Sequence, residues 1–151
     1  MENRQSPDEI RKLAMDFDRA VENRDIEKVL SSFSDDCEIE LLGQRLVGKG
    51  GVNKWIDWLY RHLDEVKFEP ITIIVEGNIF FEEFIVKARL LNGVEVSSKQ
   101  AEVLLYEDYK IKSLRLYFDR LDFAESVTKG FISKAIVKKL IKKSLEGLRS
   151  L

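Results

Sequence analysis

Three long runs of alternating polar and apolar residues constrain the fold of this chain most strongly. They cover residues 79–91, 94–106 and 110–118. Asn92-Gly93 separates the first two runs and is the strongest short hairpin signal, because a type I′ turn needs positive φ at both central residues. Residues 107–109 are turn-like. The sequence therefore predicts a meander of three long antiparallel strands.

Alternation assigns the side chains of these strands to two faces, because successive residues of a strand point to opposite sides. One face is predicted to carry Glu83, Ile85, Lys87, Arg89, Gln100, Glu102, Leu104, Leu114, Leu116 and Phe118. The other is predicted to carry Phe84, Val86, Ala88, Leu90, Ala101, Val103, Leu105, Arg115, Tyr117 and Asp119. Both faces contain apolar residues, so we expect helices to cover one and another sheet or subunit to cover the other. Exposing the second face would be costly, which predicts a homodimer through the outer sheet face.

The first half of the chain reads as helices and short strands. Ser6-Pro7 begins a helix with an apolar stripe, and Asp25 caps a second, shorter helix. A strand follows at 37–42, a short strand at 45–47, a third helix at about 52–63, and a strand at 66–75. We find no repeat and no interdomain linker.

Composition excludes several classes of protein. A chain of 151 residues with 44% hydrophobic and 34% charged residues is typical of one globular domain. No run is long and apolar enough to span a membrane and no signal peptide is recognisable, so we expect a cytoplasmic location. One cysteine (Cys37) and one histidine (His62) make a dedicated zinc site improbable, and we expect neither a metal nor a cofactor.

The charge is distributed unevenly along the chain. Residues 126–151 hold seven Lys/Arg and one Glu, which gives a charge of +6. Since the whole chain has a net charge of −2, residues 1–125 carry −8. The acidic body, without a known binding motif, predicts no nucleic-acid partner. We expect two parts, a domain at 1–125 and a basic amphipathic helix at 126–151.

This predicted helix carries one apolar stripe, formed by Ile136, Val137, Leu140, Ile141, Leu145, Leu148 and Leu151. The favoured interpretation is that the stripe docks on the body or on a partner subunit, because an exposed stripe would leave a large apolar surface. A second interpretation is contact with an anionic membrane surface.

The order of elements resembles the SnoaL-like branch of the nuclear-transport-factor-2-like superfamily, which includes ketosteroid isomerases and limonene epoxide hydrolases. The resemblance covers about residues 8–123. It is carried by Asp25, Phe33-Ser34-Asp35-Asp36, Gly48, Trp55, Gly77, Lys110-Ile111, Arg115 and Tyr117-Phe118-Asp119. It implies an α+β fold, a cone-shaped bent antiparallel sheet with the N-terminal helices packed on its concave side. The C-terminal amphipathic helix is an addition to that fold.

Most catalytic positions of the relatives are not retained. The isomerase base falls at about Leu41 and the isomerase tyrosine at Phe17, whereas the acid of the strand after the Asn-Gly turn corresponds to Glu102. The epoxide-hydrolase positions correspond to Glu83, Ile85 and Leu116, so that constellation is absent.

The resemblance and the strand alternation together place Glu83, Lys87, Arg89 and Glu102 on the pocket side. We therefore take Glu102 and Glu83 as candidate catalytic acids, since apolar walls raise the pKa of a carboxyl group. The candidate ligand-binding residues are Arg89, Lys87, Phe17, Trp58, Leu116 and Phe118. An alternative is that the charged residues form ordinary cross-strand ion pairs.

Two functions remain open. The first is a binding or assembly module for a small apolar ligand. The second is an isomerase, cyclase or hydratase that works without a cofactor by carboxylate acid–base catalysis on a small hydrophobic substrate.

Overall fold

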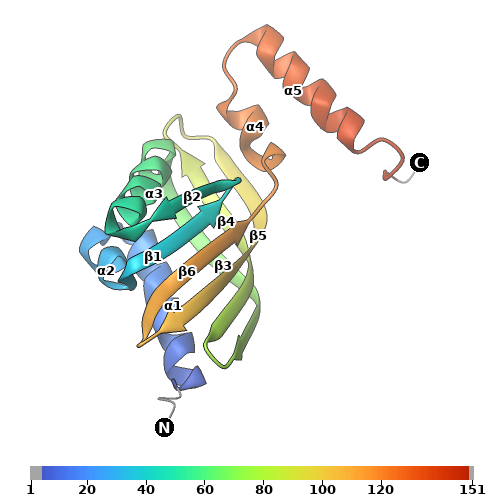
Figure 1. Cartoon of the computed structure of the whole chain (residues 1–151). Helices are drawn as coiled ribbons and strands as arrows, with labels where there is room; N and C mark the ends of the chain where they lie inside the picture. Colours follow the sequence, from blue (N-terminus) through green and yellow to red (C-terminus); the bar gives the residue numbers. More distant parts are fainter. Residues whose placement is uncertain (1–4, 150–151) are drawn as a thin grey trace.

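The structure, a computed structural model, describes residues 5–149 and consists of a curved sheet, helices on its concave side, and a C-terminal extension (Figure 1). The elements are α1 (Pro7–Glu22), α2 (Ile26–Ser31), β1 (Phe33–Leu41), β2 (Gln44–Val47), α3 (Gly48–His62), β3 (Leu63–Glu76), β4 (Ile79–Leu90), β5 (Glu95–Glu107), β6 (Lys110–Tyr117), α4 (Leu121–Val127) and α5 (Phe131–Ser144).

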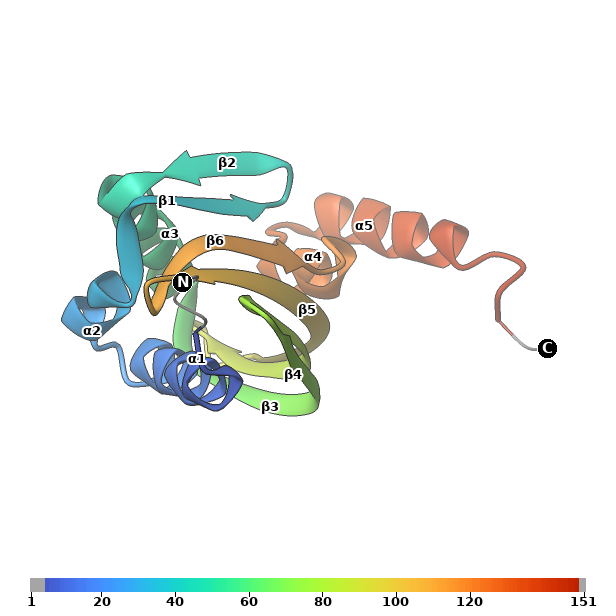
Figure 2. The ribbon, with the colours of Figure 1, turned by 60° about the horizontal axis from the view of Figure 1, so that its bottom comes forward.

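One six-stranded sheet has the order β2-β1-β6-β5-β4-β3. All neighbours are antiparallel except β1 and β6, which are parallel. The long strands β3, β4 and β5 bend around α1, and Figure 2 shows α1, α2 and α3 on one side of this curve. The predicted α+β cone with helices on the concave side is confirmed.

Helix α1 begins where the sequence predicts it. The Ser6 side chain accepts a hydrogen bond from the backbone N–H of Glu9 at 3.4 Å, and Pro7 occupies the first turn, where its missing N–H costs nothing. The residues that α1 buries against the sheet recur at helical spacing: Ile10, Ala14, Phe17, Ala20 and Val21. This stripe supplies the first wall of the core.

The loop between β4 and β5 differs from the predicted two-residue turn. The N–H of Gly93 donates to the carbonyl of Leu90 at 2.9 Å, the N–H of Leu90 donates to the carbonyl of Val94 at 2.8 Å, and only Gly93 has positive φ, at +85°. This is a three-residue loop, in which a turn is followed by a left-handed glycine. Its effect is to pair Arg89 with Glu95, one residue away from the register that a two-residue turn would produce.

That shift corrects the predicted faces of β4. Its buried residues are Phe80, Glu82, Phe84, Val86, Ala88 and Leu90. Glu82 lies opposite Glu102, and Glu83 lies opposite Ala101 on the outer face. The predicted faces of β5 and β6 are correct, since Glu102 pairs with Leu116 and Ala101 with Tyr117. The outer face therefore lacks Phe84, Val86 and Leu90, which belong to the core.

The C-terminal part forms two helices instead of one. Helix α4 is held against the body, because Ser98 donates a hydrogen bond to the carboxylate of Asp122 at 2.5 Å and Arg120 donates to the carbonyl of Leu42 at 2.8 Å. Helix α5 extends away from the body (Figures 1 and 2) and does not dock on it. Leu148 follows the end of α5, and Leu151 lies outside the described residues. Within residues 5–149, no helix has both the length and the apolar character needed to cross a membrane.

Gly51 fixes how closely α3 approaches β2. A Cβ at this position would lie 2.9 Å from the carbonyl carbon of Leu46, whereas a Cβ at Gly50, one residue earlier in the same helix, would meet nothing within 4 Å. The absence of a side chain at Gly51 thus lets α3 lie close to β2.

We predict that Gly51→Ala lowers the free energy of unfolding by about 1–3 kcal/mol, because backbone must move to relieve the contact. The matched variant Gly50→Ala is expected to be neutral or to stabilise by up to about 1 kcal/mol, since alanine is the better helix former. Urea denaturation of both variants measures the difference, and equal midpoints would contradict it.

Candidate functional site

A cavity of about 350 Å³ lies between the concave face of the sheet and helices α1, α3 and α4. Aromatic and aliphatic side chains form most of its walls, among them Phe17, Trp55, Phe68, Phe84, Leu116 and Phe118. Trp58, His62, Arg120 and Val127 also line it and are exposed, so they mark its opening. Apolar walls around a single open end are typical of a site for a small apolar molecule.

Five of the eight predicted site residues line this cavity. Glu102, Leu116 and Phe118 reach it from β5, β6 and the residue after β6, Phe17 from α1, and Trp58 from α3. The ring of Phe17 is stacked on Trp55 with centroids 6.2 Å apart, which fixes the wall opposite the sheet.

The other three predicted residues lie on the outer face, contrary to expectation. Lys87 pairs with Glu69 at 2.7 Å, and Arg89 pairs with Asp64 at 2.9 Å and with Glu65 at 3.0 Å. Glu83 is 3.8 Å from Lys99. These are the cross-strand ion pairs of the alternative interpretation, and the cause is the one-residue register difference in the β4–β5 loop.

Three carboxyl groups meet at the buried end of the cavity. Asp18 on α1, Glu82 on β4 and Glu102 on β5 each offer an oxygen, and these oxygens lie within 4.8 Å of one another. Glu82 is 1% and Glu102 is 5% exposed. Asp18 and Glu102 line the cavity, whereas Glu82 lies behind them. We call these three residues the carboxyl cluster.

Hydrogen bonding in the carboxyl cluster requires protons. Both oxygens of Glu82 and one oxygen of Glu102 are buried and have no hydrogen-bond partner among the described residues, as expected when only acceptors meet. An ionised, unpaired carboxylate in such a place is strongly disfavoured. Protons on the carboxyl cluster convert some acceptors into donors, so that the groups can bond to one another. A cation shared by the same oxygens is the other way to balance the charge.

Burial shifts the pKa values accordingly. Desolvation raises the pKa of Glu82 from its usual 4.5 to about 7, although its contacts with Asp18 and Glu102 oppose the shift. Desolvation, together with the charge of Glu82, raises the pKa of Glu102 to about 8. Burial first, and then the two glutamates, raise the pKa of Asp18 well above its ordinary value. Acids that titrate near neutral pH are suited to proton transfer.

Tyr106 adds a fourth polar group on the same strand face. It is 2% exposed, and its hydroxyl has no partner among the described residues. Desolvation, followed by the nearby charges of Glu102 and Asp18, raises the pKa of this phenol. The hydroxyl is therefore neutral at all ordinary pH values and can serve as a donor.

Asp18, Glu82 and Tyr106 were not among the predicted site residues. Asp18 is one acid within the apolar stripe of α1, four residues after Ala14, and this break in the stripe was the available signal. Glu82 shares a strand face with Phe80 and Phe84. Because Glu83 is its neighbour, the register between β4 and β5 decides which of the two glutamates lies on the cavity side. Tyr106 shares the parity of Glu102 on β5.

We predict that stability decreases as pH rises through the pKa values of the carboxyl cluster. Folded-state pKa values of about 7 and 8 exceed the ordinary 4.5, so the folded protein holds these protons more tightly than the unfolded chain. The resulting contribution is complete below about pH 4.5 and is lost as pH rises through 7 and 8. Thermal unfolding from pH 5 to pH 9 measures this dependence.

Glu82→Gln is the informative variant, because it keeps the side-chain volume and removes the ionisable group. It should stabilise the protein at pH 8.5 by an amount on the order of 3 kcal/mol and change little at pH 5. Glu83→Gln, the adjacent position on the outer face, is the control and should not alter the pH profile. Identical profiles for Glu82→Gln and the wild type would refute the assignment.

Comparison with known proteins agrees with the fold just described. The family model of the SnoaL-like domain matches residues 14–114. An NTF2-like protein of unknown function from Burkholderia pseudomallei superimposes with a TM-score of 0.73 at 19% identity, over 80% of this chain and 98% of that one. TerC co-crystallised with polyporic acid reaches 0.70 at 20% identity, over 80% and 97%.

An epoxide hydrolase of the LEH-like type from M. tuberculosis superimposes with a TM-score of 0.68 at 19% identity, over 85% of this chain and 96% of that one. A search of the curated proteins finds no match. Structural similarity at these identities shows the fold, and the family match covers two thirds of the chain. The chain therefore belongs to the SnoaL-like domain family.

Proposed function

We propose that the cavity binds a small, mostly apolar molecule that carries one hydrogen-bond acceptor, such as a ketone. The observation that carries the proposal is the position of Glu102, a buried carboxyl with a pKa of about 8 at the closed end of an apolar cavity. At neutral pH this carboxyl is mostly protonated, so it donates a hydrogen bond where a carboxylate could only accept one.

The cavity walls and the acid divide the recognition between them. Burial of the ligand's apolar surface supplies most of the affinity, at roughly 25 cal/mol per Å². The acid supplies orientation, because a ligand without an acceptor leaves the buried carboxyl unpaired. TerC, which shares the fold, was solved with polyporic acid, and this supports a small-molecule site in this architecture.

Two naphthalene derivatives of nearly equal size test this division. We predict that 2-acetylnaphthalene binds about fivefold tighter than 2-ethylnaphthalene at pH 6, since one net hydrogen bond is worth about 1 kcal/mol. The advantage should disappear above pH 8, when Glu102 loses its proton. Quenching of the Trp55 and Trp58 fluorescence reports binding.

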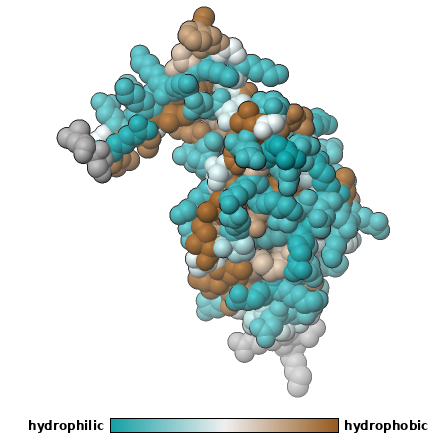
Figure 3. All heavy atoms as spheres, turned by 180° about the vertical axis from the view of Figure 1, so that it is seen from behind, coloured by the Kyte–Doolittle hydropathy of each residue, from teal (hydrophilic) through white to brown (hydrophobic). Residues whose placement is uncertain are grey.

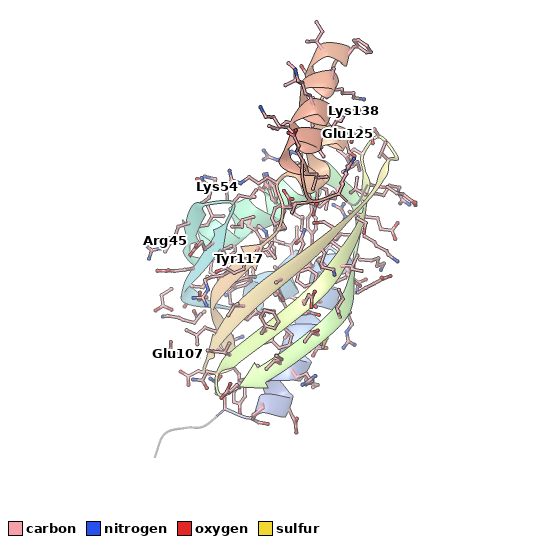
Figure 4. All side chains as sticks on the ribbon, turned by 90° about the vertical axis from the view of Figure 1, so that its right-hand side faces the viewer. Arg45, Lys54, Glu107, Tyr117, Glu125 and Lys138 are labelled. Carbon is pink, nitrogen blue, oxygen red and sulfur yellow. The ribbon has the colours of Figure 1, made fainter. Side chains whose placement is uncertain are left out.

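Two substitutions on adjacent residues of β6 control for location. Leu116→Trp fills the cavity and should abolish binding of both compounds. Tyr117→Trp places the same side chain on the outer face, where Figure 4 shows Tyr117, and should leave binding unchanged. Equal effects of the two variants, or equal affinities for ketone and hydrocarbon in the wild type, would sink the proposal.

Acid–base catalysis is the second candidate, and the carboxyl cluster favours it. Two acids with pKa values of about 7 and 8 stand side by side, so one can accept a proton while another still holds one. With a ketone bound, ionised Glu102 removes an α-proton and the carbonyl oxygen takes the electron pair. Asp18, whose pKa burial raises, lines the same cavity and can hydrogen-bond to that oxygen when it holds a proton. Return of the proton to a different carbon completes an isomerisation.

Deuterium exchange measures the first half of this reaction. We predict that the protein accelerates exchange of the α-protons of 2-tetralone in D₂O, with a rate that rises through pH 8, and that Glu102→Gln lowers the rate by about 100-fold or more. Glu83→Gln should match the wild type. NMR follows the exchange. A wild-type rate equal to that of buffer would leave the binding role and remove the catalytic one.

We also propose a homodimer through the outer sheet face. The apolar side chains on this face are Ile74, Ile79, Phe81, Ile85, Val103, Leu105 and Tyr117. Ile74 and Tyr117 are each 54% exposed. In a two-fold symmetric dimer, the same face of a second copy covers this apolar surface.

A further inference from the structure

Helix α5 presents an apolar side that no described part of the chain covers. Ile136 is 63% exposed and Leu140 is 55% exposed, and these residues lie four apart on one helix face. Val137 and Ile141 on the adjacent face are half-buried, and the main packing partner of α5 is α4. A helix of 14 residues is about 21 Å long, so most of α5 extends beyond its support.

The direction of α5 relates it to the outer sheet face. Figure 2 shows α5 on the side of the curved sheet opposite to α1 and α2, and Figure 4 shows it above the face on which Tyr117 lies. In Figure 3, hydrophobic residues gather along the side of α5 that faces the body and the open space beside it. A molecule bound to the outer face would therefore meet the apolar side of α5.

Local contacts set this direction. Only residues 128–130 separate α4 from α5, and the N–H of Lys134 donates to the carbonyl of Gly130 at 3.0 Å to begin the helix. Lys138 on α5 lies 3.4 Å from Glu125 on α4, and Figure 4 shows this pair. Ser98 and Arg120 hold α4 to the body, and the pair of Lys138 and Glu125 links α5 to α4.

Charge favours a second copy of this chain as the occupant. Helix α5 contains five lysines and no acidic residue, while residues 1–125 carry a net charge of −8. Within residues 5–149, only Lys138 of these five lysines is ion-paired. A second copy presents an acidic body and an apolar sheet face, which complement the lysines and the apolar side of α5 respectively.

We propose that α5 is an arm that packs on a second copy of this chain bound at the outer sheet face. By two-fold symmetry each copy extends its arm over the other, so the interface contains two arms and two sheet faces. This inference rests on the proposed homodimer and adds a specific contact to it.

Aspartate substitutions on opposite sides of α5 test the arm. Ile136→Asp and Leu140→Asp together should raise the dimer dissociation constant at least tenfold, as measured by light scattering and sedimentation over a range of protein concentrations. Ala135→Asp, on the other side of the same helix, should leave it unchanged. An unchanged constant in the double variant overturns the arm but not the dimer, whereas a monomeric wild type overturns both.

Crosslinking tests the contact without a destabilising substitution. Cys37 is buried, so a cysteine introduced as Leu140→Cys is the site for a benzophenone maleimide. Irradiation of mixed ¹⁵N-labelled and unlabelled protein should join α5 of one copy to residues 63–107 of the other. Crosslinks confined to one chain contradict the proposal. The proposal is also contradicted if the protein co-sediments through α5 with vesicles of phosphatidylcholine and phosphatidylglycerol while its dimer mass stays unchanged. In that case α5 binds a membrane surface and not a second copy.

Discussion

The site depends on the burial of three carboxyl groups beside an apolar cavity. Glu82 is 1% exposed, and the ion pairs of the described chain lie on the surface, away from the carboxyl cluster. Desolvation therefore dominates, and it is the largest contribution to the raised pKa of each of the three acids. The chemistry of the cavity follows from these raised pKa values, because neutral acids can donate hydrogen bonds to a ligand, whereas carboxylates would repel its acceptor groups.

The cost of burying these acids is distributed over the fold. Asp18 lies beside the apolar stripe of α1 and is partly exposed. Glu82 and Glu102 lie in the middle of two long strands and cannot turn to solvent without breaking the core. Functional sites typically hold such energetically unfavourable groups on rigid helices and strands. The family match identifies the architecture.

The sequence was sufficient for most of the fold and for half of the site. Alternation placed Glu102, Leu116 and Phe118 on one face. This placement is correct because a one-residue register shift between Leu105 and Tyr106 follows the two-residue turn at Asp108-Tyr109 and pairs Glu102 with Leu116. The same reasoning failed across Asn92-Gly93, where Asn92 keeps a negative φ and the loop holds three residues. The residues of β4 do favour the observed register, because it buries Ala88 and Leu90 and leaves Lys87 and Arg89 outside. The separation of α5 from its own body was equally unpredictable, since an amphipathic pattern specifies an apolar side and not the surface that covers it.

The three-residue loop at Gly93 also bears on how such a site can change in evolution. Because Glu82 and Glu83 are neighbours, deletion of one loop residue would still leave an acid opposite Glu102. The same deletion would turn Lys87 and Arg89 into the cavity and expel Val86 and Leu90 from the core. A change in loop length is thus blocked by packing even though it would spare the reactive groups.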